Sequence, residues 1–243
     1  MPTLFISDLH LDDARPGSTR LFGEFIDGEA RGADALYILG DLFEAWIGDD
    51  DPSQAGALVA RKLKALSDDG VPVFFIHGNR DFLLGDAYAE RCGMTLLPDP
   101  TRVDLHGTPT LLMHGDTLCT GDLAYQQFRA QTRDPEWQRQ FLSQPLEARL
   151  AFARQARGAS AKHQGALREA GTMETITDVA PDAVDDAFRA HGIDRIIHGH
   201  THRPAIHCQD GRTRIVLGDW YEQGSVLRVD GDGTELAGLD PVA

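Results

Sequence analysis

The sequence predicts an α/β fold in which several strands end at one common functional site. Five short apolar runs have the length of buried strands, and each is followed at once by residues that can bind a metal ion. Stretches with helical periodicity lie between the early runs. Because ligands gather outside the carboxyl ends of strands in α/β sheets, we expect the five endings to form one site.

The expected strands follow one another along the chain. They are residues 3–6 before Ser7-Asp8, 35–39 before Gly40-Asp41, 71–76 before His77-Gly78-Asn79, 110–113 before His114, and 193–197 before His198-Gly199-His200. Residues 54–67 are expected to form a helix, because Leu58, Leu63 and Leu66 fall on one apolar face. After His202, three runs separated by Gly- and Asp-Gly-containing turns predict further strands at residues 204–208, 213–218 and 224–229.

The stretch from residue 122 to about residue 170 has a different composition. It is rich in Gln, Arg and Ala and has few β-branched residues, which favours helices. We expect a helical insertion, residues 122–170, that lies over the strand ends within a single domain of residues 1–243. The acidic run Asp49-Asp50-Asp51 predicts a solvated loop or a helix start.

Composition disfavours several classes of protein. Hydrophobic residues make up 42% of the 243 residues, which argues against disorder, and the formal charge of −15 disfavours a nucleic-acid partner. The cysteines, Cys92, Cys119 and Cys208, are odd in number and widely spaced, so we expect no disulfide framework and a reducing cytosol. We expect no signal peptide and no membrane span, since there is no apolar run of about 18 residues. Association with a membrane surface stays open.

The strand endings carry residue types that suit a pair of metal ions. Asp8 and His10 are two residues apart, so on an extended chain both side chains would point the same way and bind one ion. Asp41 has two carboxylate oxygens and can bridge two ions, as binuclear phosphate-cleaving sites with ions about 3.5–4 Å apart require. Taken alone, each Asp could instead cap a helix or a turn.

The remaining endings add neutral ligands. Asn79 offers an amide oxygen, His114 an imidazole, and His200 and His202 a further pair at a spacing of two residues. Nitrogen and oxygen ligands without thiolate suit Mn, Fe, Zn or Co. The ordered set DxH, GD, GN, H and GHxH, each at an expected strand end, therefore predicts a metal site.

This ordered set resembles the motifs of the calcineurin-like metallophosphoesterase superfamily, over nearly the whole chain. The resemblance implies a two-layered sheet sandwich flanked by helices, with a helical cap insertion, and a hydrolytic site with two metals. It implies that one metal is bound by Asp8, His10, Asp41 and His202, and the other by Asp41, Asn79, His114 and His200.

Arg80 narrows the expected substrate. Many members of the superfamily carry His after the GN motif, where it can protonate a leaving group, but this chain has Arg80. Arginine is a poor acid and clamps phosphate oxygens well. A phosphate leaving group needs no prior protonation, so Arg80 favours a diphosphate substrate over a phosphomonoester. The alternative is a structural Arg80 paired with Asp81.

Longer strings are similar to a diphosphatase family of lipid A biosynthesis. They are SDLHLDD, GDLFEAWIGDD, HGNRDFLLG, HGDTLCTGDLAYQ and IHGHTHRPAIH. That family cleaves UDP-2,3-diacylglucosamine into UMP and 2,3-diacylglucosamine 1-phosphate. The resemblance implies two divalent ions, Mn²⁺ first among them, and a lipid-linked nucleotide-sugar substrate. It also implies a cytoplasmic protein bound peripherally to the inner membrane, with no nucleic-acid partner.

The same resemblance assigns roles to individual residues. Catalytic roles fall to Arg80, Asp41 and His200, and substrate contacts to Asn79, Arg80, Asp122, Arg157, Ser160, Gln164 and His200. After the Ser, the family carries a small polar residue and then a Lys; in this chain Gln164 could replace the first and Arg168 the second. A diacyl substrate needs an apolar chamber, for which the candidates, each of which could instead be ordinary core, are Trp46, Phe82, Leu83, Phe128, Phe141, Leu142 and Phe152.

Two other functions stay open. One is a metallophosphoesterase that acts on a soluble nucleotide, such as a dinucleoside polyphosphate or a cyclic nucleotide, and the apolar cap disfavours it. The other is a non-catalytic scaffold of the same fold. Such a scaffold would be expected to lose metal ligands, and this chain has the complete set.

Overall fold

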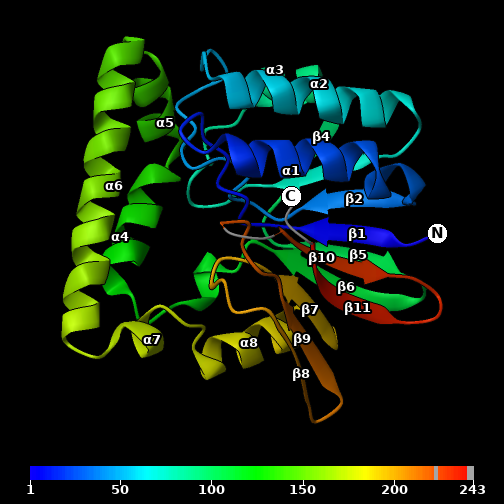
Figure 1. Cartoon of the computed structure of the whole chain (residues 1–243). Coiled ribbons are helices and arrows are strands. Elements are labelled where there is room, and N and C mark those ends of the chain that lie inside the picture. Colours follow the sequence, from blue (N-terminus) through cyan, green and yellow to red (C-terminus); the bar gives the residue numbers. More distant parts are fainter. Residues whose placement is uncertain (222–223, 240–243) are drawn as a thin grey trace.

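Two β-sheets pack face to face in the computed structural model, which describes residues 1–221 and 224–239, with helices on both outer faces (Figure 1). The last residues of the expected domain, 240–243, lie outside the described part. The first sheet has the order β11-β10-β1-β2-β3-β4, formed by Thr234–Leu239, Gly224–Val229, Thr3–Ile6, Ala35–Ile38, Val73–Ile76 and Met94–Leu97. The second has the order β5-β6-β7-β9-β8, formed by Thr101–Leu105, Thr108–Met113, Arg195–His198, Arg212–Val216 and Ala205–Gln209.

The helices divide between the two outer faces and one end of the sandwich. The first sheet is covered by α1 (Pro16–Asp27), α2 (Gln54–Asp68) and α3 (Asp86–Cys92), and the second by α8 (Pro181–His191). Single turns of 3₁₀ helix lie at Glu29–Gly32 (η1) and Asp116–Leu118 (η2). The expected helix at residues 54–67 is confirmed as α2, and the expected strands are all present, with boundaries that shift by at most two residues.

Alternation along the strands builds this layered core. On β1, Phe5 packs between the sheets, whereas Leu4 and Ile6 face the helices α1 and α2. On β6, Leu112 joins the inner layer and Leu111 packs under α8. Successive side chains of a strand point to opposite faces, and both faces of the central strands β2 and β3 are covered, so these strands are apolar throughout rather than alternating with polar residues.

Parallel pairing brings the strand ends together. In the first sheet β1, β2 and β3 run parallel to one another, and in the second β6 and β7 do so. Their carboxyl ends therefore lie at one edge of the sandwich, where each strand is followed by a short polar loop. This arrangement is what makes one site out of residues up to 194 positions apart, from Asp8 to His202.

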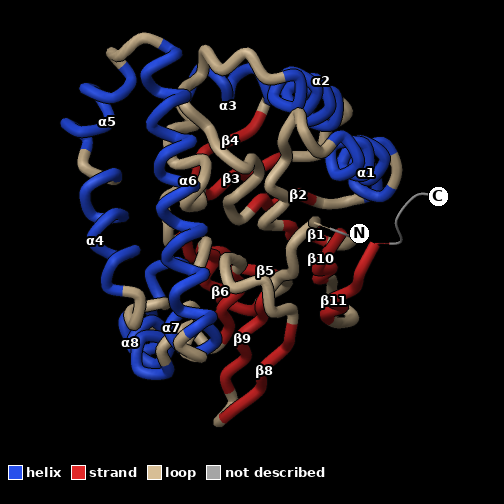
Figure 2. The backbone as a smooth tube through the Cα atoms, turned by 60° about the vertical axis from the view of Figure 1, so that its left-hand side comes forward, coloured by secondary structure: helices blue, strands red, loops and turns tan. Residues whose placement is uncertain are grey.

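Helices fill the stretch expected to be a cap. They are α4 (Leu123–Thr132), α5 (Pro135–Leu142) and α6 (Leu146–Glu169), followed by the short α7 (Met173–Ile176). Figure 2 shows α4, α5 and α6 standing together beside the strand ends rather than on a sheet face. None of the helices formed by residues 1–221 is long and apolar enough to cross a bilayer.

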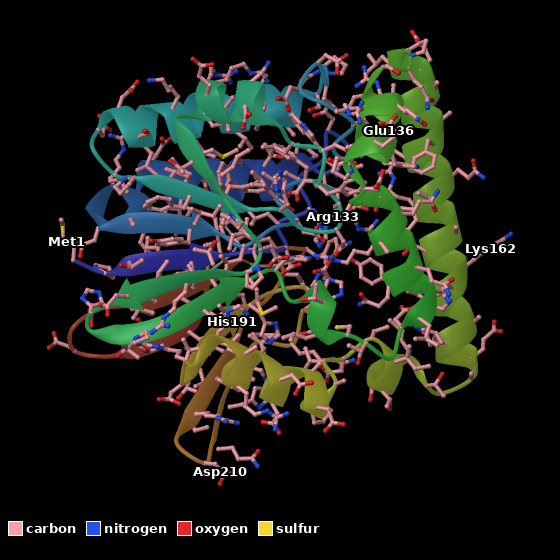
Figure 3. All side chains as sticks on the ribbon, turned by 180° about the vertical axis from the view of Figure 1, so that it is seen from behind. Met1, Arg133, Glu136, Lys162, His191 and Asp210 are labelled. Carbon is pink, nitrogen blue, oxygen red and sulfur yellow. The ribbon has the colours of Figure 1, made fainter. Side chains whose placement is uncertain are left out.

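Side chains attach the cap to the sandwich. Arg133, which Figure 3 shows between the cap and the sheets, donates to the carbonyl oxygen of Gly78 at 2.8 Å. Arg149, at the start of α6, donates to the carbonyl oxygen of Ile47 at 2.6 Å and to both carboxylate oxygens of Asp50. The cap therefore rests on the loops that follow β2 and β3.

The acidic run at residues 49–51 forms a loop before α2, as expected, but it is not simply solvated. Asp49 accepts hydrogen bonds from the backbone N–H groups of Gly85 and Tyr88, at 2.8 and 2.9 Å, and so caps α3. Asp51 accepts from the N–H of Ser53 at 2.8 Å, at the start of α2. Buried helix starts leave backbone donors that need such acceptors.

Candidate metal centre and the cavity beside it

The structure places the seven predicted metal ligands together at the carboxyl ends of β1, β2, β3, β6 and β7. One group contains Asp8, His10 and His202, whose ligand atoms all lie within 4.8 Å of one another. Nε2 of His202 is 3.3 Å from Oδ1 of Asp8 and 3.2 Å from Nε2 of His10. Oδ2 of Asp41 is 3.9 Å from Nε2 of His10, on the side that leads to the other ligands.

The second group lies on the far side of Asp41. Oδ1 of Asn79 is 2.9 Å from Nε2 of His114 and 2.8 Å from Nδ1 of His200. Nε2 of His114 is 3.8 Å from Oδ1 of Asp41. Asp41 thus directs one oxygen toward each group, which is the arrangement that a bridging carboxylate needs. Asp8 also lies close to Asp41 and His114.

The donor set fits two divalent cations. Ligand atoms that bind one ion at about 2.1 Å lie roughly 3 Å apart around it, and the spacings above have this size. Nε2 of His10 and Nε2 of His202 face each other at 3.2 Å, so their lone pairs can point at one ion. Oδ1 of Asp8 is buried and finds no hydrogen-bond partner among residues 1–221 and 224–239. A shared cation would satisfy all three atoms.

The ligands sit on an unusual backbone. Five of them have positive φ angles: Asp8 (56°), His10 (49°), Asp41 (53°), His200 (68°) and His202 (54°). The extended geometry that we expected for the DxH and HxH pairs is therefore wrong, because in both motifs the strand ends before the first ligand residue. Left-handed conformations cost roughly 1–2 kcal/mol per residue, and such strain concentrates at functional sites.

Glycines allow the ligand loops to pack against one another. A Cβ on Gly78 would lie 2.1 Å from Oδ1 of Asp41, and a Cβ on Gly199 would lie 2.3 Å from Oδ2 of Asp8. Gly40 has φ +87°, and a Cβ there would lie 2.6 Å from Cα of Gly78. The glycines of the GD, GN and GH motifs are thus required by close approach to the neighbouring loops.

A second layer of acceptors orients the ligands. Nδ1 of His114 is 2.9 Å from the carbonyl oxygen of Leu39, and Nδ1 of His202 is 3.3 Å from Oδ2 of Asp219, so each ring presents Nε2 to the site. Sequence reasoning missed Asp219, although the run at residues 213–217 ends in Gly218-Asp219, the same pattern as Gly40-Asp41.

Asp81 holds the GD and GN loops together. It is fully buried and accepts from the backbone N–H groups of Gly78 at 2.8 Å and Leu42 at 2.7 Å. Its carboxylate is thus occupied by backbone donors. The sequence-based alternative, in which Arg80 is held by Asp81, is wrong because Arg80 lies instead 3.7 Å from Oε1 of Glu44.

The cluster has strongly perturbed ionisation. Burial raises the pKa of Asp41 to about 7, against the opposing charge of His114. Burial would lower the pKa of His114, but the neighbouring carboxylates of Asp41 and Asp116 overcome it and raise the pKa to about 9. Burial lowers the pKa of His10 and His200 to about 3. Such perturbation from charges packed in a low-dielectric cleft is typical of functional sites.

Arg80 is fixed at its backbone, and its side chain makes a looser contact with Glu44. Its N–H donates to Oδ1 of Asp41 at 2.8 Å, and its carbonyl oxygen accepts from the N–H of Trp46 at 3.0 Å. Its Nε is buried without a hydrogen-bond partner in the described part of the chain. Arg80 lines the cavity described below, which puts a permanently charged guanidinium next to the predicted metal ligands.

A cavity of about 530 Å³ extends from the metal ligands under the cap. Asn79, His200 and His202 line one part of it together with Arg80. Six of the seven residues proposed for an acyl chamber line the rest: Trp46, Phe82, Leu83, Phe128, Phe141 and Phe152. Leu142 does not, because it ends α5 with its side chain turned outward and is 41% exposed.

One face of α6 contributes the polar cap residues. Arg157, Ser160 and Gln164 are spaced three and four residues apart and all line the cavity, whereas Arg168 does not. The structure therefore places Gln164, not Arg168, beside the cavity. Asp122 lines it too and caps α4 by accepting from the N–H of Tyr125 at 3.0 Å.

Sequence reasoning missed an aromatic residue between the cap and the metal ligands. The ring of Tyr125, on α4, lies 5.7 Å from that of His200, and its hydroxyl donates to buried Asp116. Asp116 also accepts from Nε of Arg129 at 2.8 Å. The only advance signal was the position of Tyr125, three residues after Asp122 in the string GDLAYQ, which is too general to be informative.

Comparison with known proteins finds a matching family model, relatives with similar sequences, and solved structures with a partly similar fold. The family model described as calcineurin-like phosphoesterase matches residues 1–204. A protein named UDP-2,3-diacylglucosamine hydrolase from Xanthomonas campestris pv. campestris is 65% identical, over 98% of this chain and 99% of the relative. A protein of the same name from Stenotrophomonas maltophilia is also 65% identical, over 97% and 98%. Among solved structures, an archaeal phosphodiesterase aligns over 98% of this chain and 100% of its own, at 13% identity and a TM-score of 0.49.

Proposed function

This chain belongs to the calcineurin-like phosphoesterase family, and from that premise we propose that it hydrolyses the diphosphate bond of UDP-2,3-diacylglucosamine. The products are UMP and 2,3-diacylglucosamine 1-phosphate, an intermediate of lipid A biosynthesis. Water adds across the bond between the two phosphates, so each product carries one of them. The relatives with this name cover the chain almost from end to end, the cap included.

One observation supports this substrate above others. The metal ligands and Arg80 open into the same cavity that the aromatic residues of the cap line. A substrate of this shape needs both parts at once, a charged end for a diphosphate and an apolar end for acyl chains. Burial of an acyl chain there contributes roughly 0.8 kcal/mol per methylene group.

The residues of the site divide the work between them. Two divalent ions bound by the seven ligands would activate a water for attack on phosphorus and neutralise charge on the phosphoryl oxygens. Asn79 and His200 also line the cavity and so contact the substrate as well as the ions. Arg80 supplies a permanent positive charge to the diphosphate oxygens. The leaving phosphate needs no acid, which agrees with an arginine at this position.

Further features of the proposal concern cofactor and setting. We assign Mn²⁺ to the site on the resemblance to the lipid A diphosphatase family, and the imidazole, carboxylate and amide-oxygen ligands are compatible with this ion. We assign residues 122–170 as a cap inserted in a single domain. We assign a peripheral position at the inner-membrane surface, since the acyl chains of the substrate are anchored there and must reach the cavity from the bilayer.

The test is turnover of the proposed substrate by the whole chain. Purified protein with Mn²⁺ is incubated with UDP-2,3-diacylglucosamine, and the release of UMP is measured. Release of nucleotide from UDP-glucose and from a dinucleoside polyphosphate is measured under the same conditions. We expect UMP from the diacyl substrate and little product from the soluble nucleotides. Brisk turnover of a soluble nucleotide with no UMP from the diacyl substrate would contradict the proposal and favour the alternative nucleotide phosphoesterase.

A further inference from the structure

Two buried nitrogens beside the metal centre lack hydrogen-bond partners. Nδ1 of His10 and Nε of Arg80 are both buried and unsatisfied within the described residues. The first belongs to a metal ligand and the second to the phosphate-binding residue. Buried donors without acceptors are rare in folded proteins because each costs free energy, so the groups around these two nitrogens are informative.

A single carboxylate lies next to Nδ1 of His10 and next to the guanidinium of Arg80, where its nearest atom is NH1 rather than Nε. Oε2 of Glu44 is 3.6 Å from Nδ1 of His10, and Oε1 of Glu44 is 3.7 Å from NH1 of Arg80. Glu44 lines the cavity and its side chain is 18% exposed. Both separations are slightly too long for hydrogen bonds, and a small movement of the carboxylate toward the site would close them.

The tautomer of His10 requires an acceptor on this side. Nε2 of His10 faces His202 and Asp41, so it is the nitrogen that binds an ion. Nδ1 must then carry the hydrogen, and a metal-binding histidine nearly always donates that hydrogen to a carboxylate or carbonyl. The corresponding acceptors for His114 and His202 are Leu39 and Asp219. For His10, the matching group is Glu44.

Glu44 is itself held in place. Its N–H donates to the carbonyl oxygen of Leu11 at 3.1 Å, which ties it to the loop that carries His10. Arg15 donates from NH2 to Oε2 of Glu44 at 3.1 Å and to the carbonyl oxygen of His10 at 2.7 Å. The guanidinium of Arg15 also covers the ring of Tyr221, which stacks on the imidazole of His10 at 5.0 Å.

We propose that Glu44 is a positioning residue that links the metal centre to the phosphate clamp. One oxygen orients His10 toward its ion by accepting the Nδ1 hydrogen, and the other orients the guanidinium of Arg80 over the phosphate. Loss of Glu44 therefore weakens the binding of one metal ion and, at the same time, leaves the guanidinium of Arg80 without its partner. The role of Arg80 in this inference rests on the proposed function, whereas the role of His10 rests on the metal site alone.

The experiment compares Glu44→Ala and Glu44→Gln with the wild type. Manganese binding is measured by calorimetry without substrate, and kcat and KM are measured for UMP release. The amide of Gln keeps a hydrogen-bond acceptor but loses the negative charge. We therefore expect the manganese affinity and the turnover of Glu44→Gln to lie between those of the wild type and those of Glu44→Ala. Glu44→Ala should bind one of its two ions about 10- to 100-fold more weakly. Glu24→Ala, an exposed residue of α1, is the matched control and should behave like the wild type.

A double-variant cycle tests the link to Arg80. If Glu44 acts through Arg80, the rate loss of Glu44→Ala with Arg80→Ala should be much smaller than the product of the two single losses. Manganese binding by Glu44→Ala equal to that of the wild type, or losses that simply multiply, would overturn the inference. Failure of the wild type itself to release UMP would instead contradict the proposed function, and it would leave the manganese comparison intact.

Discussion

Replacement of Arg149 by Met should loosen the cap without disturbing the metal centre. The side chain of Arg149 is 5% exposed and makes three hydrogen bonds across the junction between cap and sandwich, one to Ile47 and two to Asp50. Met fills a similar volume but donates no hydrogen bond. Both acceptors then lose their partner, and the first turn of α6 loses its attachment to the loop after β2.

The free energy lost in Arg149→Met can be estimated from how far each of the two partners, Asp50 and Ile47, is exposed to solvent. Asp50 is 61% exposed, so its pairing is screened by solvent and contributes only about 0.5–1 kcal/mol. The bond from the charged guanidinium to the carbonyl oxygen of Ile47 is buried and contributes about 1.5 kcal/mol. Together these give about 2 kcal/mol, or roughly a thirtyfold change in the equilibrium between attached and released cap.

The difference in cap attachment between the wild type and Arg149→Met should be fully present at neutral pH. The hydrogen bond from Arg149 lowers the pKa of Asp50 below its ordinary value of 3.8. A carboxylate whose pKa is lowered by folding stabilises the protein above its unfolded pKa, and that contribution is lost as the pH falls through the folded value. Wild type and variant should therefore differ fully at pH 7, and only the part of the difference due to Asp50 should disappear below about pH 4, because the bond to the carbonyl oxygen of Ile47 does not titrate.

Hydrogen exchange of backbone amides is the direct assay. In Arg149→Met, the amides of residues 146–152 and of the loop at residues 47–51 should exchange about 30-fold faster than in the wild type, while those of β1 and β2 stay unchanged. The matched control is Arg139→Met on α5, whose side chain is 73% exposed and pairs with Glu136 on the same helix. If exchange in Arg149→Met matched that of the control, the attachment we assign to Arg149 would be refuted.

The remaining predictions concern the ions and the cavity. Asp41→Ala and His114→Ala should bind fewer ions than the wild type and lose more than about 1,000-fold in turnover with unchanged circular dichroism; full activity in either would exclude them as ligands. Arg80→Ala should lower kcat by about 100-fold or more at normal manganese content, and loss of manganese would show that its role is misassigned. Phe128→Ala should raise KM for the diacyl substrate about tenfold, whereas Leu142→Ala, outside the cavity, should not; equal effects would argue against an acyl chamber. Removal of metal by chelation should lower the melting temperature by about 5–10 °C relative to protein with manganese at 100 times its dissociation constant, and no shift would mean that the folded state does not bind the ion.

Much of the architecture was predictable because it depends on local patterns. The runs before Asp8, Asp41 and Asn79 are apolar without interruption, since parallel strands covered on both faces leave no solvated positions. Their endings are polar because the loops leave the core there. The convergence of these endings followed from one general property of α/β sheets, so the ligand set required no knowledge of individual distances.

The parts that sequence reasoning missed depend on contacts between distant segments. Asp219 and Glu44 become acceptors for His202 and His10 only after the loops meet. The outward orientation of Leu142 depends on where α5 ends, and helix ends are poorly fixed by periodicity. The conformation at Asp8 was also mispredicted, because a two-residue spacing fits an extended strand and a left-handed turn equally well.

Different interactions stabilise the metal end and the cap end of the cavity. This explains why the residues that form the two ends follow different sequence patterns. At the metal end, five ligands keep left-handed backbones, which persist only when the surroundings leave no alternative. The close glycines and the backbone bonds to Asp81 supply that constraint, so each position admits few residue types. At the cap end, α4, α5 and α6 are ordinary helices attached by a few long side chains, such as Arg133 and Arg149. Aromatic and aliphatic residues can replace one another there with little backbone cost. The metal motifs are therefore strict and legible in a single sequence, whereas the cap becomes interpretable only when its side chains are seen around the cavity.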